Sequence, residues 1–224
     1  MTVQRLLSAI RKLRNGKGSP DGCTAEMFKH LPDNALCLLA EYFSWVIANL
    51  SIPDCWTVVT AILIPKMVGA SSLNKFRAIA CLPAARKLLG YIWMQMLPCL
   101  RYESIQCGVV PKSHAANGVY LIKRALELSK EWGKSIFMAQ LDLRKAFDRV
   151  AHSSVVNALK LQGASLQCVA VLCAILNQST AAVTLGHVKA MPILMQRGLP
   201  QGAPESPLLF TLVTEAVLRP LIRE

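Results

Sequence analysis

The chain has 224 residues, is 53% hydrophobic, and carries 25 Lys and Arg residues against 13 Asp and Glu, for a formal net charge of +12. This hydrophobic share excludes global disorder, and the length suits one or two globular domains. The basic surplus favours a polyanionic partner such as nucleic acid or an anionic membrane surface, although a solvated basic surface would give the same charge.

The cysteines and the longest uncharged segment bear on the compartment. The eight cysteines form no C-x-x-C pair, so we expect buried free thiols in an intracellular protein, cytoplasmic and/or nuclear. Residues 161–188 contain no Asp, Glu, Lys or Arg. Their strongly apolar part, CVAVLCAIL, is shorter than the roughly 20 residues of a spanning helix. We therefore predict a buried helix followed by a strand, and no membrane segment. The amino terminus, VQRLLSAIRKLR, is basic and amphipathic and does not indicate a signal peptide.

In the first half of the chain, the turn-rich stretch NGKGSPDG predicts a loop at 15–22. Apolar residues at helical spacing and β-branched runs then predict the following elements. We expect helices at 24–31, 34–50 and 83–100, and strands at 57–66 and 75–82.

In the second half, a helix is expected at 115–132, ending at Gly133, followed by a strand at 135–143, SIFMAQLDL. Further on we expect helices at 152–162, 165–177 and 206–224, and two strands at 180–186 and 190–196 that form a hairpin. Helices and short strands without strict alternation predict an α+β fold.

The stretch LDLRKAFDRV, residues 141–150, has two carboxylates beside basic side chains. A carboxylate at a strand end is suited to Mg²⁺, which takes one or two carboxylates together with substrate phosphates. Lys and Arg nearby would then contact those phosphates. Alternatively, Asp142 caps the following helix and Asp148 belongs to a solvated face.

Two other stretches allow for anion binding. In RGLPQGAPESPLLF, Gly198 and Gly202 permit close backbone approach to a ligand just before a helix amino terminus. In LIPK and KFRAIACLP, Lys66 and Arg77 could meet across a hairpin and hold a phosphate chain. An ordinary connecting loop and an exposed charged hairpin are the alternatives.

In order and content, these stretches resemble the reverse transcriptase domain of non-LTR (LINE-type) retrotransposons, with kinship to group II intron reverse transcriptases. NGKGSPDG is similar to the K-x-G-x-D-G segment, and LIPK with FRAIACLP to the fingers hairpin LIPK and YRPI. ESIQCGVVPKSHAANGV resembles the Q-x-G-F segment. LDLRKAFDRV resembles motif A, D-x-x-x-A-F-D, and RGLPQGAPESPLLF resembles motif B, P-Q-G-x-x-x-S-P. The matches run from about residue 15 to 218.

The resemblance implies an α+β fold formed by the fingers and part of the palm of a right-hand polymerase. It implies mainly fingers at about 1–133, palm motif A at 134–150, a fingers and palm return at 151–196, and motif B at 197–224. Asp142 would be the catalytic carboxylate and a ligand of the metal, with the backbone of Leu143 beside it.

The resemblance also implies a site for an incoming nucleotide. Phe147 would be the steric gate under the sugar, where a ribose 2′-hydroxyl would otherwise fit. Asp148 would support the end of the strand and bind no metal. The nucleotide-binding residues would be Lys66, Arg77, Lys145, Ala146, Phe147, Gln201 and Gly202.

The sequence departs from the family pattern at three points. FRAIA replaces YRPI, and VVPKSHAANG lacks the usual Arg and Asp, with Lys112 as a possible substitute charge. No Y-x-D-D is present in the 224 residues. That motif would supply the carboxylates with which two Mg²⁺ ions are held about 4 Å apart. We therefore expect a fragment or truncated copy that does not polymerise alone.

The intact enzyme would take an RNA template, a DNA primer and deoxynucleoside triphosphates. The first alternative is a non-catalytic nucleic-acid-binding relic of a retroelement. The second is a helical membrane-associated or interaction protein built on residues 161–188.

Overall fold

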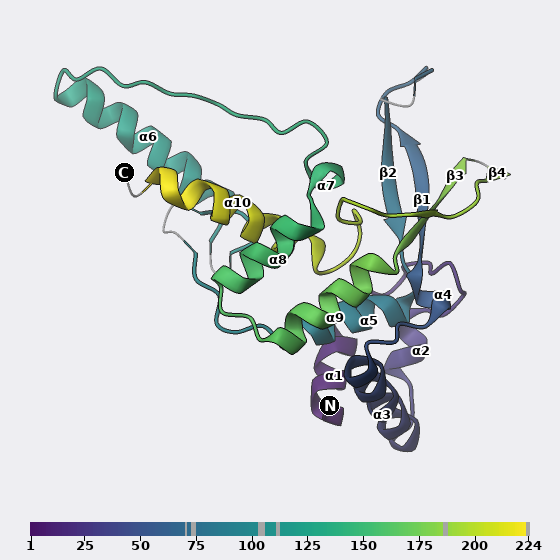
Figure 1. Ribbon diagram of the computed structural model, residues 1–224. Coiled ribbons are helices and arrows are strands. Elements are labelled where there is room, and N and C mark those ends of the chain that lie inside the picture. Colours follow the sequence, from purple (N-terminus) through teal and green to yellow (C-terminus); the bar gives the residue numbers. More distant parts are fainter. Residues whose placement is uncertain (70, 73–74, 103–105, 111–112, 186–187, 223–224) are drawn as a thin grey trace.

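The computed structural model describes all residues except 70, 73–74, 103–105, 111–112, 186–187 and 223–224 (Figure 1). The helices are α1 (Val3–Lys12), α2 (Ala25–Lys29), α3 (Asp33–Asn49), α4 (Asp54–Thr57), α5 (Ala84–Met94), α6 (Ala115–Glu131), α7 (Ala146–Arg149), α8 (His152–Leu161), α9 (Leu166–Asn177) and α10 (Ser206–Ile222). The strands are β1 (Val58–Pro65), β2 (Phe76–Cys81), β3 (Thr180–Leu185), β4 (Val188–Lys189) and β5 (Ile193–Leu194). The mixture confirms the predicted α+β class. Lys112, considered above as a substitute charge, lies outside the described residues.

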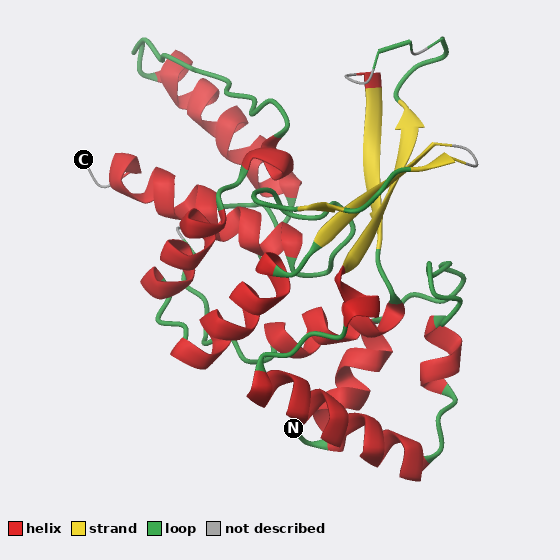
Figure 2. Ribbon diagram, turned by 45° about the vertical axis from the view of Figure 1, so that its right-hand side comes forward, coloured by secondary structure: helices red, strands yellow, loops and turns green. Residues whose placement is uncertain are grey.

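The sheet has the order β2-β1-β3-β4, with β5 also paired to β3. β1 and β2 form an antiparallel hairpin in which Ile64 lies opposite Arg77, and β3 runs parallel to β1. The strand predicted at 190–196 is confirmed only at Ile193–Leu194, where β5 pairs antiparallel with β3. The short strand β4 also pairs antiparallel with β3, and it lies at 188–189, where the turn was expected. Figure 2 shows β1 and β2 projecting away from the helices.

One large hydrophobic core is formed mainly by helices, which lie at one end of the sheet. Phe43 of α3, Leu88 and Trp93 of α5 and Leu172 of α9 are fully buried in it. The indole N–H of Trp93 donates to the Cys168 carbonyl at 2.8 Å, so α5 is tied to α9. The predicted buried helix at 165–177 and the strand after it are therefore confirmed as α9 and β3.

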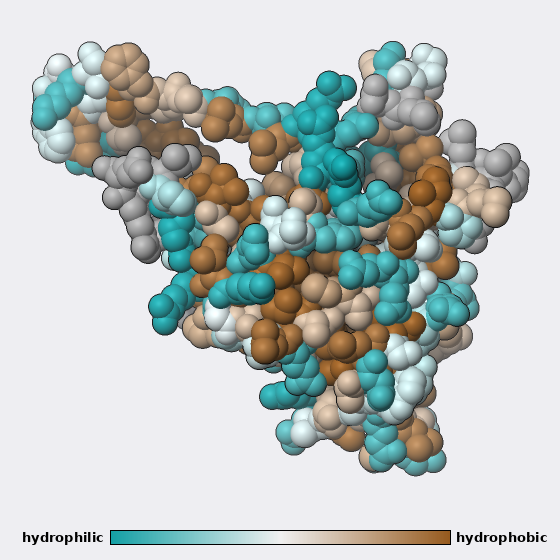
Figure 3. All heavy atoms as spheres, viewed as in Figure 1, coloured by the Kyte–Doolittle hydropathy of each residue, from teal (hydrophilic) through white to brown (hydrophobic). Residues whose placement is uncertain are grey.

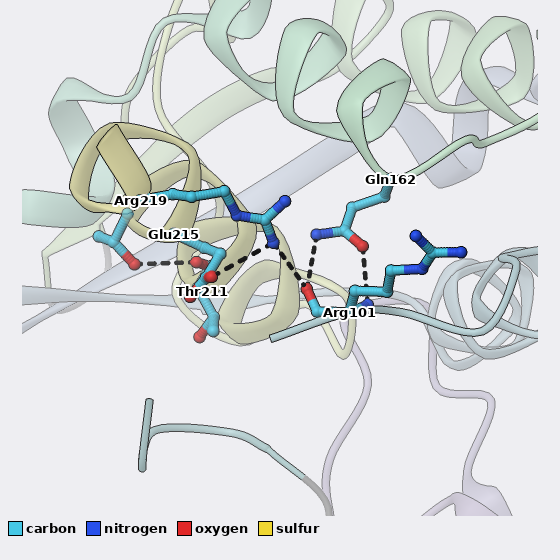
Figure 4. Close-up of polar contacts among 6 residues, drawn as sticks. Arg101, Gln162, Thr211, Glu215 and Arg219 are labelled. Atoms are coloured by element: carbon cyan, nitrogen blue, oxygen red, sulfur yellow. Dashed lines mark hydrogen bonds and ion pairs between the residues drawn. The ribbon is translucent and has the colours of Figure 1, made fainter. Parts of the chain in front are cut away.

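Arg101 links α8 and α10 through its backbone (Figure 4). The Gln162 amide accepts a hydrogen bond from the Arg101 N–H and donates one to the Arg101 carbonyl, both at 2.8 Å. Arg219 of α10 donates to the same carbonyl and pairs with Glu215, with nitrogen to oxygen distances of 3.3 and 3.4 Å. These bonds fasten α10, whose first turn contributes to the candidate site.

The strand predicted at 135–143 is wrong. Residues 134–143 form no strand and run as a long connection from α6 to α7 (Figure 1). Phe137 and Leu141 are 98% and 85% exposed. A strand needs a neighbour for its backbone groups and a surface against which to bury its apolar side chains. The described part of the chain provides neither for this segment.

The expectation of buried cysteines is also wrong in most positions. The eight cysteines are free, but only Cys168 is buried, while Cys23, Cys37, Cys55 and Cys99 are exposed. These four lie in short helices, at helix surfaces or in connections, where a small side chain reaches solvent. Among the described helices, none is long and apolar enough to cross a bilayer.

Candidate nucleotide-binding site

Three segments that are far apart in the sequence line one pocket of about 480 Å³. They are the β1–β2 hairpin, the turn that leads into α7, and the loop before α10. Six of the residues expected to bind a nucleotide lie in its wall: Lys66, Arg77, Lys145, Phe147, Gln201 and Gly202. Three of these side chains are cationic, which suits a ligand with several phosphates.

The turn into α7 has a backbone that few residues adopt. Lys145 lies in the left-handed region, with φ 53° and ψ 47°. For a residue with a side chain this conformation costs about 1–3 kcal/mol and needs support from surrounding structure. It turns the chain so that Lys145, Phe147 and Asp148 all reach the pocket. Figure 3 shows hydrophilic side chains gathered around α7.

The loop before α10 provides that support. The Gly198 N–H donates to the Val150 carbonyl at 2.8 Å, and the Leu199 N–H donates to the Phe147 carbonyl at 2.9 Å. Gly198 has φ +91°, and a Cβ there would lie 3.0 Å from the backbone carbonyl oxygen of Asp148. A glycine is therefore required for both the backbone angle and the close approach.

The same loop is joined to the hairpin. The Ala80 N–H of β2 donates to the Gln201 carbonyl at 2.9 Å. Gly202 has φ +144°, and a Cβ on it would overlap the Ala80 carbonyl oxygen. The loop thus lies directly against β2, which carries Arg77, and Gln201 and Arg77 are held on neighbouring segments.

Three residues of the site were not predicted from the sequence. Phe210 of α10 stacks on Phe147, with ring centroids 4.8 Å apart and planes 21° apart. The Nε2–H of His152 donates to the Gly198 carbonyl at 3.1 Å. Ser206 is buried in the pocket wall, and its hydroxyl makes no hydrogen bond within the described residues. Ser206 is the serine of the P-Q-G-x-x-x-S-P pattern, which could have pointed to it, whereas nothing local in the sequence indicates the contacts of Phe210 and His152.

The expected metal ligand lies apart from the pocket. Asp142 and Leu143 are exposed on the connection before α7, and neither they nor Ala146 line the pocket. Asp148, expected only to support the motif, does line it. No group of three or more His, Cys, Asp or Glu side chains comes together in the described parts of the chain. These residues alone therefore do not fit a site for two metal ions.

A second groove of about 750 Å³ lies beside the first pocket, and Gly202 contributes to both. Its floor includes Ile62 and Ile79 of the hairpin, which are 40% and 37% exposed. Its wall also includes Tyr91 and three cations, Arg14, Lys17 and Lys87. Burial raises the pKa of the Tyr91 hydroxyl, while the nearby Arg14 charge acts in the opposite direction. Apolar and aromatic surface with a cationic rim is typical of single-stranded nucleic-acid sites.

The hairpin, the turn into α7 and the glycine loop therefore form the wall of one pocket that carries three cationic side chains. Residues 64–224 match the family model described as "Reverse transcriptase (RNA-dependent DNA polymerase)". Because this match covers more than half of the chain, the chain belongs to the reverse transcriptase family. That family generally uses divalent metal ions.

Similar proteins show that, within this family, the chain is related to the reverse transcriptases of non-LTR retrotransposons. The chain is 26% identical over 226 residues to the Pol polyprotein of the Drosophila melanogaster type-2 element R2DM, covering 100% of this chain and 21% of that protein. It is 29% identical over 169 residues to the R2 Pol polyprotein of Popillia japonica, covering 75% and 24%. It is 26% identical over 224 residues to the transposon TX1 149 kDa protein of Xenopus laevis, covering 97% and 17%. The chain thus spans about a fifth of the length of these relatives.

Proposed function

We propose that this chain supplies the deoxynucleotide-binding part of an RNA-directed DNA polymerase. The observation that carries the proposal is the convergence of three distant segments on one cationic pocket. Arg77, Lys66 and Lys145 would bind the triphosphate, and the backbone of Ala146, which does not line the pocket in this structure, would join them in the intact enzyme. Phe147 would lie under the sugar, and Gln201 and Gly202 would contact the base and the template.

Asp142 is proposed as the first catalytic carboxylate, with Leu143 beside it, in a site for two Mg²⁺ ions in the intact enzyme. Each divalent ion needs several oxygen ligands, so further carboxylates must join Asp142. The exposed connection at 134–143 would then take its place in the palm. By the same resemblance, about 1–133 would be mainly fingers, 151–196 the return and 197–224 motif B.

The second groove is proposed as the path of the RNA template. Its apolar floor and Tyr91 offer surfaces for bases, and Arg14, Lys17 and Lys87 offer charges for phosphates. Sharing Gly202 with the first pocket would bring a template base beside the incoming nucleotide. The DNA primer would approach from the side of Asp142. The free cysteines are compatible with an intracellular setting, cytoplasmic or nuclear.

A nucleotide titration tests the proposed pocket. Binding of a deoxynucleoside triphosphate with Mg²⁺ would be followed by NMR for the 224-residue protein, for Arg77→Ala and for Arg124→Ala. A charge-assisted hydrogen bond contributes about 1.5–3 kcal/mol, so Arg77→Ala should weaken binding by about tenfold or more. Arg124 is exposed on α6 and serves as the control. Equal affinity of Arg77→Ala and the unchanged protein would refute the pocket.

A primer-extension assay tests the catalytic part. With an RNA template, a DNA primer and Mg²⁺, we expect no extension by these 224 residues, because two-metal transfer needs more carboxylates than Asp142. Template-dependent extension would overturn this view of the metal site.

A non-catalytic nucleic-acid-binding relic is the second candidate, favoured by the net charge of +12. Phosphate contacts make such binding strongly salt-dependent. Salt-dependent RNA binding that survives Asp142→Asn, with no effect of added nucleotide, would support the relic over the polymerase.

A further inference from the structure

A buried ion pair joins α5 to the loop that precedes α10. The guanidinium of Arg86 and the carboxylate of Glu205 are 2.5 Å apart, and both side chains are 2% exposed. The two residues are separated by 119 positions in the sequence. Glu205 directly precedes α10 and follows Gly202 by three residues, so the pair is anchored beside the proposed nucleotide pocket.

The helix surface is shaped around the carboxylate. Gly90 lies one turn after Arg86 on α5, and a Cβ on it would overlap the Glu205 Oε2 atom. It would also lie 2.9 Å from the ring of Pro204. Any larger side chain at this position would displace Glu205 and the loop with it.

Stability is a weak reason for this pair. Arg86 Nη1 and Glu205 Oε2 have no hydrogen-bond partner within the described residues, so one contact has to offset the burial of two charges. Apolar residues of similar volume in place of a buried ion pair are often neutral or stabilising. What an apolar pair lacks is a fixed direction, which a guanidinium–carboxylate contact supplies.

The pair completes a second link between two segments of the site. β2 carries Arg77 and leads through Leu82 and Pro83 into α5. The first link is the hydrogen bond from the Ala80 N–H to the Gln201 carbonyl. The second is Arg86 with Glu205, on the other side of Gly202. The two links thus join the loop to the segment from β2 to α5 on both sides of Gly202.

We propose that the Arg86–Glu205 ion pair positions Gln201 and Gly202 relative to Arg77, so that nucleotide affinity depends on the pair more than stability does. The two residues are positioning residues and touch no nucleotide themselves. The inference rests on the proposed nucleotide pocket.

The test compares affinity with stability. The double variant Arg86→Met/Glu205→Leu replaces the pair by apolar side chains of similar size. The control Arg124→Met/Glu127→Leu removes the exposed pair on α6, whose atoms are 3.3 Å apart. Nucleotide binding with Mg²⁺ would be measured by NMR, RNA binding by anisotropy and unfolding by circular dichroism.

We expect the double variant to unfold at an equal or higher urea concentration than the unsubstituted protein. It should lose less affinity for RNA than for the nucleotide, because Gly202 is the one residue of the displaced loop among the residues that line the second groove. Its nucleotide affinity should fall by about tenfold or more, the effect of losing one charge-assisted hydrogen bond in the pocket. The control should change none of the three. Unchanged nucleotide affinity in the folded double variant would overturn the positioning role.

If the double variant fails to fold, the single variant Arg86→Lys tests whether the ion pair positions the loop. Lys keeps the charge but loses the planar fork, so direction is lost while the charge pair remains. Weaker nucleotide binding at unchanged helix content supports the proposal, and unchanged binding rejects it. An unchanged protein that binds no nucleotide would instead refute the pocket itself, and this inference with it.

Discussion

The loop of motif B and the segment that leads into motif A lie in sharply different surroundings in this structure. The loop around Gly198 and Gly202 donates or accepts backbone hydrogen bonds with Phe147, Val150 and Ala80. The segment 134–143 is exposed along its whole length. Motif A itself contacts the motif B loop at Phe147 and Val150, whereas the described residues bury no side chain of 134–143.

The largest effect of a single substitution is expected at Gly202, where the motif B loop lies against β2. Gly202→Ala would force a side chain into a left-handed backbone and against the Ala80 carbonyl. We expect a loss of about 2–4 kcal/mol in the free energy of unfolding, together with loss of nucleotide binding. Urea unfolding followed by circular dichroism measures it.

The control is Gly18→Ala, because a Cβ there meets nothing within 4 Å. It should change the free energy of unfolding by no more than about 0.5 kcal/mol. Equal stability of both variants would show that the loop does not depend on its contact with β2.

Phe210→Ala tests the stacking that fixes Phe147. Removing a half-buried aromatic ring should cost about 1–3 kcal/mol of unfolding free energy, less than at a fully buried site. It should also free the Phe147 ring and weaken discrimination between deoxyribonucleotides and ribonucleotides in binding. Phe210→Leu, which keeps apolar volume, should lose less of both. Unchanged discrimination in Phe210→Ala would mean that Phe147 is held by other contacts.

Alkaline pH should loosen the packed region. Burial raises the pKa of the Cys168 thiol from 9.0 to about 11. The folded state therefore holds this proton more tightly than the unfolded state. Its stabilisation is complete below about pH 9 and is lost as the pH rises to about 11. The free energy of unfolding should fall by at most about 1.4 kcal/mol per pH unit in this window.

Cys168→Ala isolates this effect, because it removes the titrating group. Burial also raises the pKa of Tyr91 and of Tyr102, which adds loss in the same direction above pH 10. The variant should therefore lose less stability than the unchanged protein between about pH 8 and about pH 10.5 in urea titrations. The same loss in both proteins would contradict the assignment to Cys168.

The sequence predicted those elements whose signal lies within a few neighbouring residues. It did not predict features that depend on contacts between residues far apart in the chain. The β1–β2 hairpin and the loop before α10 follow from β-branched runs, glycines and prolines within a few residues. The mostly apolar run at 135–143 indicates a preference for burial, but burial also needs a surface that covers these side chains. Arg86 and Glu205 look like ordinary surface charges in the sequence. They are 119 positions apart, so no local pattern indicates that they form an ion pair.

The smallest effect is expected in the exposed segment itself. Phe137 is 98% exposed, so Phe137→Ser removes no contact with the described residues and should change the free energy of unfolding by about 0.5 kcal/mol at most. Nucleotide binding should be equally unaffected. Phe210→Ala is the matched change, because it removes the same ring from the packed side of the comparison. A loss in Phe137→Ser as large as in Phe210→Ala would show that 134–143 packs in solution, and the contrast between this segment and the motif B loop would then be wrong.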